Sequence, residues 1–287
     1  MEIKDKNLYY VGGVVRDELI GYKSIDTDYC YEGNAIEFAK KQGLNIVKEN
    51  PDFGTVRILE DGKEIDIAST RTEIYPKKGH LPQIIKIGCS LKEDLKRRDF
   101  AVNALAKRTT DGEIIDFFEG LKDIKNKKLR ILHDESFVDD PTRIIRGLKF
   151  SVRFNFELEK TTFESQKKYL ENINYDMSYH RLKKELIETF NLNNQIAYDK
   201  FVDQMLYKLL GKNVSIPTLK EKIQPNVDEN LCIWIMYLGY FDLSNLPLTR
   251  KEKSILKWVS KLETQAHTNN TPKESIIMYK VKTGKIL

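Results

Sequence analysis

A change in hydrophobic pattern near residue 115 constrains the fold of this chain more than any other feature. Before that point, short apolar runs alternate with turn residues, which is typical of a mixed strand-and-helix domain. From residue 140 onward, apolar residues recur at three- and four-residue spacing, which predicts helices over 140–152, 160–172, 180–192, 195–210, 229–240 and 249–263. A chain of 287 residues has room for two or three modules. We therefore predict the α+β class, with an N-terminal domain of mixed sheet and helices followed by an all-helical region.

The first 115 residues also carry signals for individual elements. Strands are predicted over 8–11, 27–31, 53–59 and 64–68, and helices over 14–20, 34–42 and 91–107. Asp61-Gly62 lies between the last two strands, and this dipeptide is a strong hairpin signal. Two prolines and one glycine within residues 76–82 indicate a loop.

Composition excludes several classes of protein. Hydrophobic residues make up 40% of the chain and charged residues 32%, which is a soluble globular composition. The longest apolar stretch, residues 231–241, is far short of the ~20 residues that cross a bilayer, and the first ten residues lack an apolar signal core. Cys30, Cys89 and Cys232 are too scattered for a zinc site or a disulfide framework. We therefore expect a cytoplasmic, reducing location.

Charge is distributed unevenly along the chain. Residues 1–199 contain 34 basic and 35 acidic side chains, whereas residues 200–287 contain 14 and 8, a balance of +6. A basic C-terminal region fits a polyanionic partner such as a nucleic acid. Excess lysine on exposed helices is the common alternative.

Two glycines and a pair of aspartates suggest nucleotide chemistry. Gly12-Gly13 lies between a predicted strand and a helix, where it lets the backbone approach a phosphate, and Arg16 can add donors one turn later. Asp26 and Asp28 are two residues apart on a predicted strand, so their carboxylates point to one face. Carboxylates that close repel unless a cation intervenes, and oxygen ligands favour magnesium. A pair of exposed turn aspartates is the alternative interpretation.

Asp66 is a third candidate metal ligand, because it is a polar residue embedded in the apolar run 64–68. A strand-edge carboxylate bonded to a neighbour explains it equally well. Two magnesium ions ~3.5–4 Å apart can serve an in-line phosphoryl displacement. The sequence has neither a Walker-type lysine motif nor an HExxH helix. A glycine turn with an Asp-x-Asp pair therefore fits a nucleotidyl transferase better than a hydrolase.

Longer motifs extend this interpretation into a family resemblance. The chain contains, in order, GGVVRD, DTDY, EIDIASTRTEIYPKKGHLP, DLKRRDFAVNALA, DFFEGLKDIKNKKLR and DDPTRIIRGLKFSVRF, with a looser match at SYHRLKKEL. These motifs resemble those of class II tRNA nucleotidyltransferases and bacterial poly(A) polymerases, in the same order. The resemblance implies a nucleotidyltransferase head over residues 1–115 and a helical neck with a base-reading helix over 116–175. It places a helical body and a shortened, RNA-binding tail over 176–287.

The resemblance also implies roles for single residues. It assigns magnesium binding to Asp26 and Asp28, which are the catalytic pair. It assigns a linking hinge to Asp116, Gly120, Asp123 and Arg130, and the switch between C and A addition to a mobile loop within 76–90. It assigns nucleotide binding to Gly13, Arg16, Arg98, Asn103, Asp140, Arg143 and Arg146.

The base-reading pair has a physical basis of its own. Asp139-Asp140-Pro141 predicts a helix start, and Arg143, three residues after Asp140, is expected on the same side of that helix. A carboxylate accepts and a guanidinium donates, which matches the Watson–Crick edges of cytosine and adenine. Guanine and uracil would leave groups unpaired, at ~1–3 kcal/mol each. A capped helix with a surface ion pair is the alternative.

The expected activity is template-independent addition of CMP and AMP (CCA) from CTP and ATP to tRNA 3′ ends, with Mg²⁺ as cofactor and release of pyrophosphate. This chain departs from the family pattern at Asp139, Lys149 and His180, and Lys149 replaces an arginine with a point charge. These departures leave A-only tailing or poly(A) synthesis as an alternative. An RNA-binding protein with an inactive head is a third hypothesis, which the intact Asp26, Asp28 and Arg98 disfavour.

Overall fold

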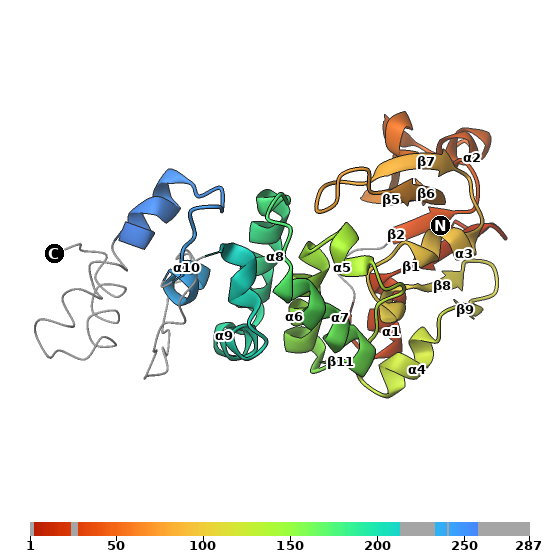
Figure 1. Ribbon diagram of the computed structural model, residues 1–287. Helices are drawn as coiled ribbons and strands as arrows, with labels where there is room; N and C mark the ends of the chain where they lie inside the picture. The colour runs from red at the N-terminus through yellow and green to blue at the C-terminus, as the bar shows by residue number, and fades with distance from the viewer. Residues whose placement is uncertain (1–2, 24–27, 213–232, 240, 258–287) are drawn as a thin grey trace, which may run out of the picture. The chain divides into compact units, whose positions relative to one another are not determined.

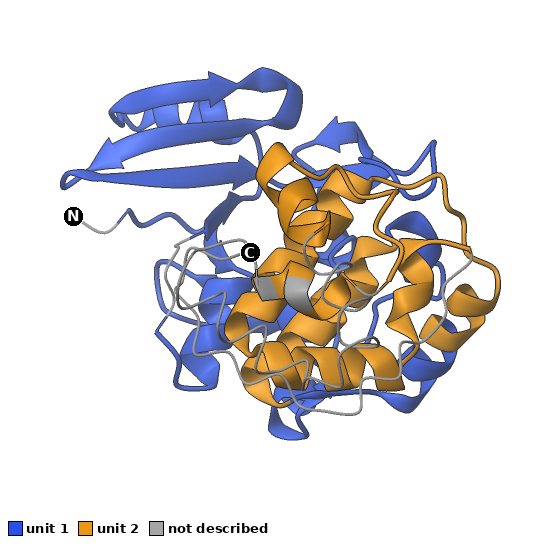
Figure 2. Ribbon diagram, turned by 90° about the vertical axis from the view of Figure 1, so that its left-hand side faces the viewer, with its two compact units in different colours: residues 1–140, 156–165 blue, residues 141–155, 166–287 orange. Residues whose placement is uncertain are grey.

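Residues 3–23, 28–212, 233–239 and 241–257 are described in the computed structural model of this protein. They belong to two units (Figure 2): unit 1 comprises residues 1–140 and 156–165, and unit 2 comprises residues 141–155 and 166–287. The chain therefore passes between the units three times. Within the described ranges, no helix is both long and apolar enough to span a membrane. The expected division at residues 115 and 175 stays a prediction.

Unit 1 holds every strand of the described ranges and the short helices between these strands (Figure 1). In chain order its elements are β1 (Leu8–Val11), α1 (Gly13–Leu19), β2 (Asp28–Tyr31), α2 (Ala35–Lys41), β3 (Ile46–Asn50), η1 (Pro51–Phe53), β4 (Thr55–Glu60), β5 (Lys63–Ser69), β6 (Arg71–Ile74), β7 (Gln83–Ile87), α3 (Leu91–Lys96), η2 (Ala101–Asn103), β8 (Leu105–Arg108), β9 (Ile114–Asp116), α4 (Gly120–Lys125), β10 (Lys128–Leu129), α5 (Ser136–Asp139), β11 (Glu157–Leu158) and the first half of α7 (Lys160–Glu171).

Seven of these strands form one sheet in the order β3-β4-β5-β2-β1-β8-β9. β2 and β5 are parallel, and the other neighbouring pairs are antiparallel. The β4–β5 hairpin closes at Asp61 and Gly62, whose φ angles of 49° and 75° are the positive values that a tight hairpin turn needs. This turn confirms the hairpin predicted from the dipeptide. The sheet joins strands that are far apart in sequence, so Asp28 lies opposite Asp66.

The two faces of the sheet are covered differently. On one face, Val56, Ile58 and Ile67 pack with α2 in a buried cluster. On the other face, Val11 and Cys30 of β1 and β2 pack with α3. Side chains alternate between faces along a strand. The residues of β3, β4 and β5 that alternate with those packed on α2 therefore point to the second face. They do not belong to the cluster that α3 forms with β1 and β2.

Unit 2 contains the helices that the periodicity predicted. They are α6 (Thr142–Phe154), the second half of α7, α8 (Tyr179–Leu192), α9 (Asn194–Asp203), η3 (Leu206–Leu210), α10 (Ile233–Leu238) and a helix over 250–257. α6 packs against α8. Phe190 of α8 contacts Phe201 of α9 and Tyr237 of α10, with ring centroids 6.1 and 6.0 Å apart. The remaining parts of the predicted helices 229–240 and 249–263 lie outside the described residues.

Two helix predictions are too long. The predicted helix 91–107 ends at Lys96, and the chain then forms η2 and β8. Its apolar residues are buried by the sheet instead: Ala104 and Ala106 belong to the cluster beneath α3. The predicted helix 195–210 is interrupted at Met205, whose φ of 56° is incompatible with a continuous right-handed helix.

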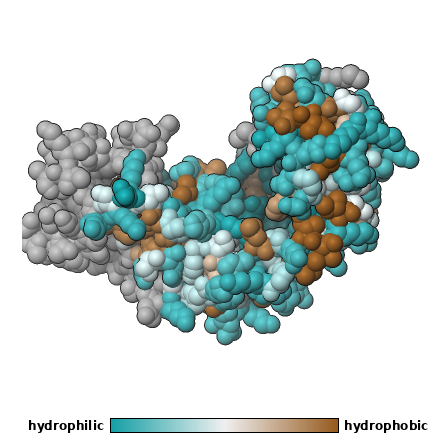
Figure 3. Space-filling view, turned by 90° about the horizontal axis from the view of Figure 1, so that it is seen from above, coloured by the Kyte–Doolittle hydropathy of each residue, from teal (hydrophilic) through white to brown (hydrophobic). Residues whose placement is uncertain are grey.

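The β6–β7 hairpin forms a separate two-stranded sheet, and the predicted loop 76–82 is its connection. Ile74, Leu81 and Ile85 of this hairpin are exposed, Leu81 by 70%. Figure 3 shows apolar patches on the surface of unit 1 among mostly hydrophilic side chains. The hairpin therefore buries little of its apolar surface in the core of unit 1.

The turn into α4 is built around one carboxylate and one glycine. The Asp116 side chain accepts hydrogen bonds from the backbone N–H groups of Phe118, Gly120 and Leu121, at 3.1, 2.9 and 2.9 Å. A Cβ atom at Gly120 would lie 2.4 Å from the Ala101 carbonyl oxygen. Nearby, Arg130 donates to the Phe118 carbonyl oxygen at 2.6 Å and pairs with Asp123 at 2.9 Å. The four residues of the expected hinge thus surround the start of α4, and their role as a hinge stays a prediction.

Gly120→Ala should destabilise the protein by about 3 kcal/mol, because the new methyl group would overlap backbone atoms that cannot rotate away. Urea unfolding followed by circular dichroism measures the loss. Gly43→Ala is the control: its φ is 64° but nothing lies within 4 Å of its Cβ position, so only backbone strain of about 1 kcal/mol is expected. Equal losses in the two variants would contradict the packing argument.

Candidate active site

The predicted glycine turn closes directly over Arg98. Gly12 has a φ of 70°, and a Cβ atom there would lie 2.8 Å from Nη1 of Arg98. α1 begins at the next residue, Gly13. The positive φ favours glycine at position 12, and a side chain there would also push the Arg98 guanidinium away. The sequence identified the turn but not its partner, which is 86 residues away in the chain.

Arg98 is held by a buried carboxylate that the sequence analysis did not single out. Asp94 is 0% exposed. It accepts from Nη2 of Arg97 at 2.7 Å, from Nη2 of Arg98 at 3.3 Å and from the backbone N–H of Arg71 at 3.1 Å. Burial alone raises the pKa of Asp94, but the positive charges of Arg98 and Arg97 outweigh it and hold the pKa below the usual range. Asp94 is therefore the anchor that orients both arginines.

Arg16 and Asn103 meet in a second buried network beside the turn. Their side chains are 4% and 5% exposed. The Arg16 guanidinium donates to Asp17 at 2.6 and 2.9 Å and also to the Asn103 side-chain oxygen. Asn103 in turn donates to Asp99 at 2.9 Å. The structure thus brings these two predicted residues together, bound to protein groups, and their contact with a nucleotide stays a prediction.

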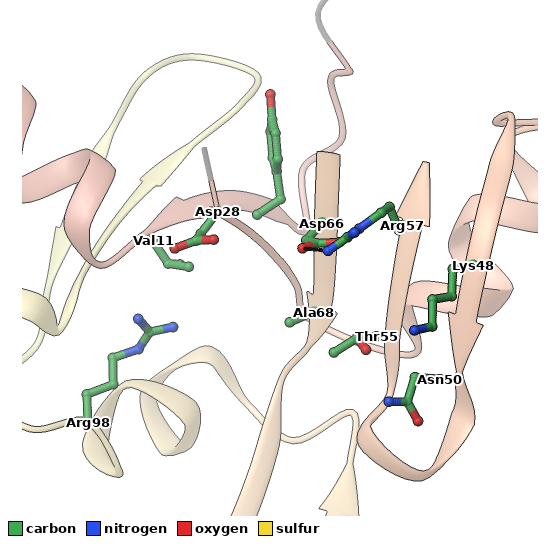
Figure 4. A pocket seen from close by; sticks show the side chains of 10 residues that line it. Val11, Asp28, Lys48, Asn50, Thr55, Arg57, Asp66, Ala68 and Arg98 are labelled. Atoms are coloured by element: carbon green, nitrogen blue, oxygen red, sulfur yellow. Dashed lines mark hydrogen bonds and ion pairs between the residues drawn. The ribbon is translucent and has the colours of Figure 1, made fainter. Parts of the chain in front are cut away.

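Asp28 lies on the second face of the sheet, at the wall of a cavity of about 350 Å³ (Figure 4). The strand register places four charged residues in one row across this face: Lys48, Arg57, Asp66 and Asp28 are successive cross-strand partners. Arg98 lines the same cavity from the segment after α3. Asp26, the other predicted ligand, lies outside the described residues.

Asp66 has a partner of its own. Nε and Nη2 of Arg57 donate to its two carboxylate oxygens at 2.7 and 2.9 Å, and these bonds hold the pKa of Asp66 below its usual range. Asp66 is therefore bonded to a neighbouring strand, although β5 lies inside the sheet and not at its edge, and its role as a metal ligand stays a prediction. Among the described residues, no group of three His, Cys, Asp or Glu side chains is arranged to hold a metal ion.

The base-reading residues differ from the expected arrangement. α6 begins at Thr142, and Asp140 precedes it in an extended conformation, with φ of −142° and ψ of 91°. The expectation that Asp140 and Arg143 share one side of a helix is therefore wrong. The reason is Pro141, since the residue before a proline is disfavoured in the α conformation. Asp140 and Arg143 are each 4% exposed.

Arg146 and Lys149 connect α6 to α8. Arg146 pairs with Glu185 at 3.3 Å, and Lys149 pairs with Glu185 at 2.5 Å and Glu188 at 2.7 Å. Lys149 is the residue that departs from the family pattern. Its ammonium group is thus engaged in holding two helices together within unit 2.

The loop between β6 and β7 reaches the residue before Asp140. Lys78 forms an ion pair with the Asp139 carboxylate, and the backbone N–H of Gly79 donates to the Asp139 carbonyl oxygen at 3.0 Å. These bonds join the tip of the predicted mobile loop to the end of α5. Nothing in the sequence identified Asp139 as the partner of this loop.

Comparison with known proteins places this geometry in a family. Residues 8–130 match the poly A polymerase head domain. The chain is 45% identical over 161 residues to the A-adding tRNA nucleotidyltransferase of Aquifex aeolicus, covering 54% of this chain and 19% of that protein. It is 41% identical over 194 residues to the CCA-adding enzyme of Streptococcus agalactiae, covering 66% of this chain and 48% of that protein. The matched part spans about half or less of these relatives.

Solved structures agree in fold. A CCA-adding enzyme without ligand superposes with a TM-score of 0.78 at 32% identity, covering 92% of this chain and 70% of that chain. CCA-adding enzyme complexes with ATP and with CTP each give a TM-score of 0.74 at 30% identity, covering 97% and 70%. The chain belongs to the family of CCA-adding and A-adding tRNA nucleotidyltransferases, which has the poly A polymerase head domain.

Asp94→Asn should destabilise the protein by about 3 kcal/mol at pH 7, because it removes the buried counter-charge of Arg98 and leaves Arg97 with Glu73 alone. The folded pKa of Asp94 is lowered, so its contribution is complete above the unfolded value of about 3.9 and is lost as the pH falls below it. Urea unfolding at pH 7 and pH 3 measures both effects.

The exposed carboxylate Asp52 supplies the control, since Asp52→Asn should change stability by no more than about 0.5 kcal/mol. A difference between wild type and Asp94→Asn that grew as the pH fell would contradict the assignment of a lowered pKa.

Proposed function

We propose that this protein adds CMP and AMP from CTP and ATP to the 3′ ends of tRNA. The observation that supports this most is the position of Asp28. Its carboxylate lies at a cavity bounded by Arg98 under the glycine turn and by the carboxylate of Asp66. The carboxylates could hold a cation and the fixed guanidinium could bind phosphate. This arrangement therefore suits the transfer of a nucleotidyl group. The names of the relatives that match this chain supply the nucleotides and the RNA class.

Mg²⁺ is the proposed cofactor. Asp28, with Asp26, would hold it, and Asp66 would be available to it if Arg57 released the carboxylate. The donor set fits, because carboxylate oxygens are the ligands that Mg²⁺ takes and two of them are adjacent across β2 and β5. When bound, the ion lowers the pKa of the attacking hydroxyl and neutralises charge on the leaving pyrophosphate.

The residues around the turn would bind the triphosphate. Arg98 would donate to phosphate oxygens, with its guanidinium fixed by Asp94, and Gly12 and Gly13 would let the backbone approach. Arg16 and Asn103 would act by holding the turn in place, since both are buried and bound to each other. A rigid donor set costs little reorganisation during transfer, which favours the reaction.

Asp140, Arg143 and Arg146 are proposed to select the base. An acceptor from Asp140 and donors from Arg143 suit cytosine and adenine, as the sequence analysis argued. The loop bonds to Asp139 would couple the β6–β7 hairpin to this selection. The basic region after residue 200 would bind the RNA backbone through charge and shape, and most of it lies outside the described residues.

A-only addition is the second candidate. The curated relatives that match include A-adding as well as CCA-adding enzymes. In this chain Lys149 is bound to Glu185 and Glu188, so it is not presented to a base as an arginine fork would be. A cytoplasmic location stays a prediction in either case.

Radiolabelled nucleotides decide between the two. The purified protein should incorporate CTP on tRNA transcripts that lack CCA or CA, and ATP on transcripts that lack only the final A. GTP and UTP should be poor substrates, by about tenfold to a hundredfold per mismatched group. Incorporation of ATP alone on every transcript would contradict CCA addition and support A-only tailing.

Asp28→Asn should abolish nucleotide addition while the protein stays folded, because the neutral amide cannot replace a metal-binding carboxylate. Addition is measured with ATP and a transcript that lacks the final A, and folding by thermal unfolding. Glu37→Gln, an exposed change on α2 at the opposite face of the sheet, should keep full activity. Unchanged addition by Asp28→Asn would make the catalytic assignment wrong, whereas retained RNA binding without addition would support it.

A further inference from the structure

The half of the sheet face next to the catalytic carboxylate carries an uncovered set of polar and basic side chains. Lys48 and Asn50 of β3 and Thr55 and Arg57 of β4 all line the cavity that contains Asp28 (Figure 4). We call these four residues the acceptor face. Their neighbours Val56 and Ile58 point the other way, into the core beneath α2. Core packing therefore explains the residues on one face of these strands, but it does not explain the polar and basic residues of the acceptor face.

The two cations of the acceptor face are accessible. Lys48 is exposed and makes no salt bridge with any residue that the structure describes. Arg57 is 43% exposed at its side chain, and its partners Asp66 and Glu64 are each 55% exposed. Exposed ion pairs contribute little to stability and exchange partners easily. The guanidinium fork of Arg57 can therefore turn from a carboxylate to a phosphate, which it fits equally well.

Basic residues line the cavity on both sides of Asp28. Arg98 and the glycine turn lie on the side of β1 and α3, whereas Lys48 and Arg57 lie on the side of β3 and β4, beyond Asp66. In an in-line displacement at phosphorus, the attacking and leaving oxygens are at opposite ends. If the triphosphate binds Arg98, pyrophosphate leaves on that side. The attacking 3′-hydroxyl must then approach from the acceptor face.

We propose that the acceptor face binds the last phosphodiester of the RNA strand that receives the nucleotide, through Lys48, Asn50 and Arg57. The assignment rests on the proposed function, since it needs an RNA end as the second substrate. Lys48 would attract the phosphate, Arg57 would bind it through two donors, and the amide of Asn50 would hydrogen-bond the adjacent ribose. These contacts are to the backbone, so they serve any terminal base and suit successive additions at one site.

The test removes the charge from each side of the proposed contact. The acceptor is a hairpin RNA with a tRNA acceptor stem that lacks the final A, made with either a normal or an uncharged methylphosphonate linkage between its last two nucleotides. kcat/KM for this RNA is measured with saturating ATP for wild type and for Lys48→Gln. Each single change should lower kcat/KM by about tenfold to a hundredfold. Both together should lower it little further, because the same contact is removed twice.

Three further measurements separate this role from a structural one. The KM for ATP should stay within about twofold in Lys48→Gln, and Lys48→Arg should restore addition. The salt dependence of the KM for RNA should weaken in Lys48→Gln, by about 0.7 in the slope of log KM against log salt. Lys63→Gln is the matched control, because Lys63 is an exposed lysine of β5 whose side chain alternates to the other face.

Fully additive losses from the methylphosphonate and Lys48→Gln would overturn the acceptor face while leaving the proposed function intact. A raised KM for ATP with an unchanged KM for RNA would do the same. A wild-type protein that added no nucleotide to the unmodified hairpin would overturn the proposed function, and the acceptor face with it.

Discussion

The buried carboxylate of Asp94 is the interaction on which the rest of the site depends. It neutralises Arg97 and Arg98 and accepts from the backbone of β6, so it joins α3 to the strand that begins the β6–β7 hairpin. A buried charge of this kind persists only when its partners satisfy it. Arg98, held in this way, lies close to the backbone at Gly12, where a side chain would displace the guanidinium.

The two faces of the sheet differ: one is packed in the core and the other borders the cavity. One face is packed with α2 and stabilises unit 1. On the other face, α3 packs with β1 and β2, while β3 and β4 keep charged residues beside the cavity. Lys48 and Arg57 lie on one side of Asp28, and Arg98 lies on the other. The proposed binding of two anionic substrates, one on each side of Asp28, rests on this single arrangement.

Parts of the fold and the site follow from local sequence, and these were predictable. The β4–β5 hairpin depends on Asp61 and Gly62, and α8 depends on a regular apolar spacing, so both formed as expected. The helix expected over 91–107 ends early because the chain instead forms η2 and β8, which bury Ala104 after η2 and Ala106 in β8 against the sheet. Asp140 and Arg143 do not share one side of a helix, because Pro141 disfavours the α conformation at the residue before it and so keeps Asp140 extended.

The sequence by itself determined four of the strands of unit 1 (β1, β2, β4 and β5), the glycine turn, the candidate carboxylates and the family to which they point, since each of these depends on residue types at short spacing. Only the tertiary structure decided which distant residues meet. It placed Asp66 opposite Asp28, Arg98 beneath Gly12 and Lys78 on Asp139. Strand pairing and ion pairing bring together residues that are dozens of positions apart, and no spacing rule along the chain encodes that proximity.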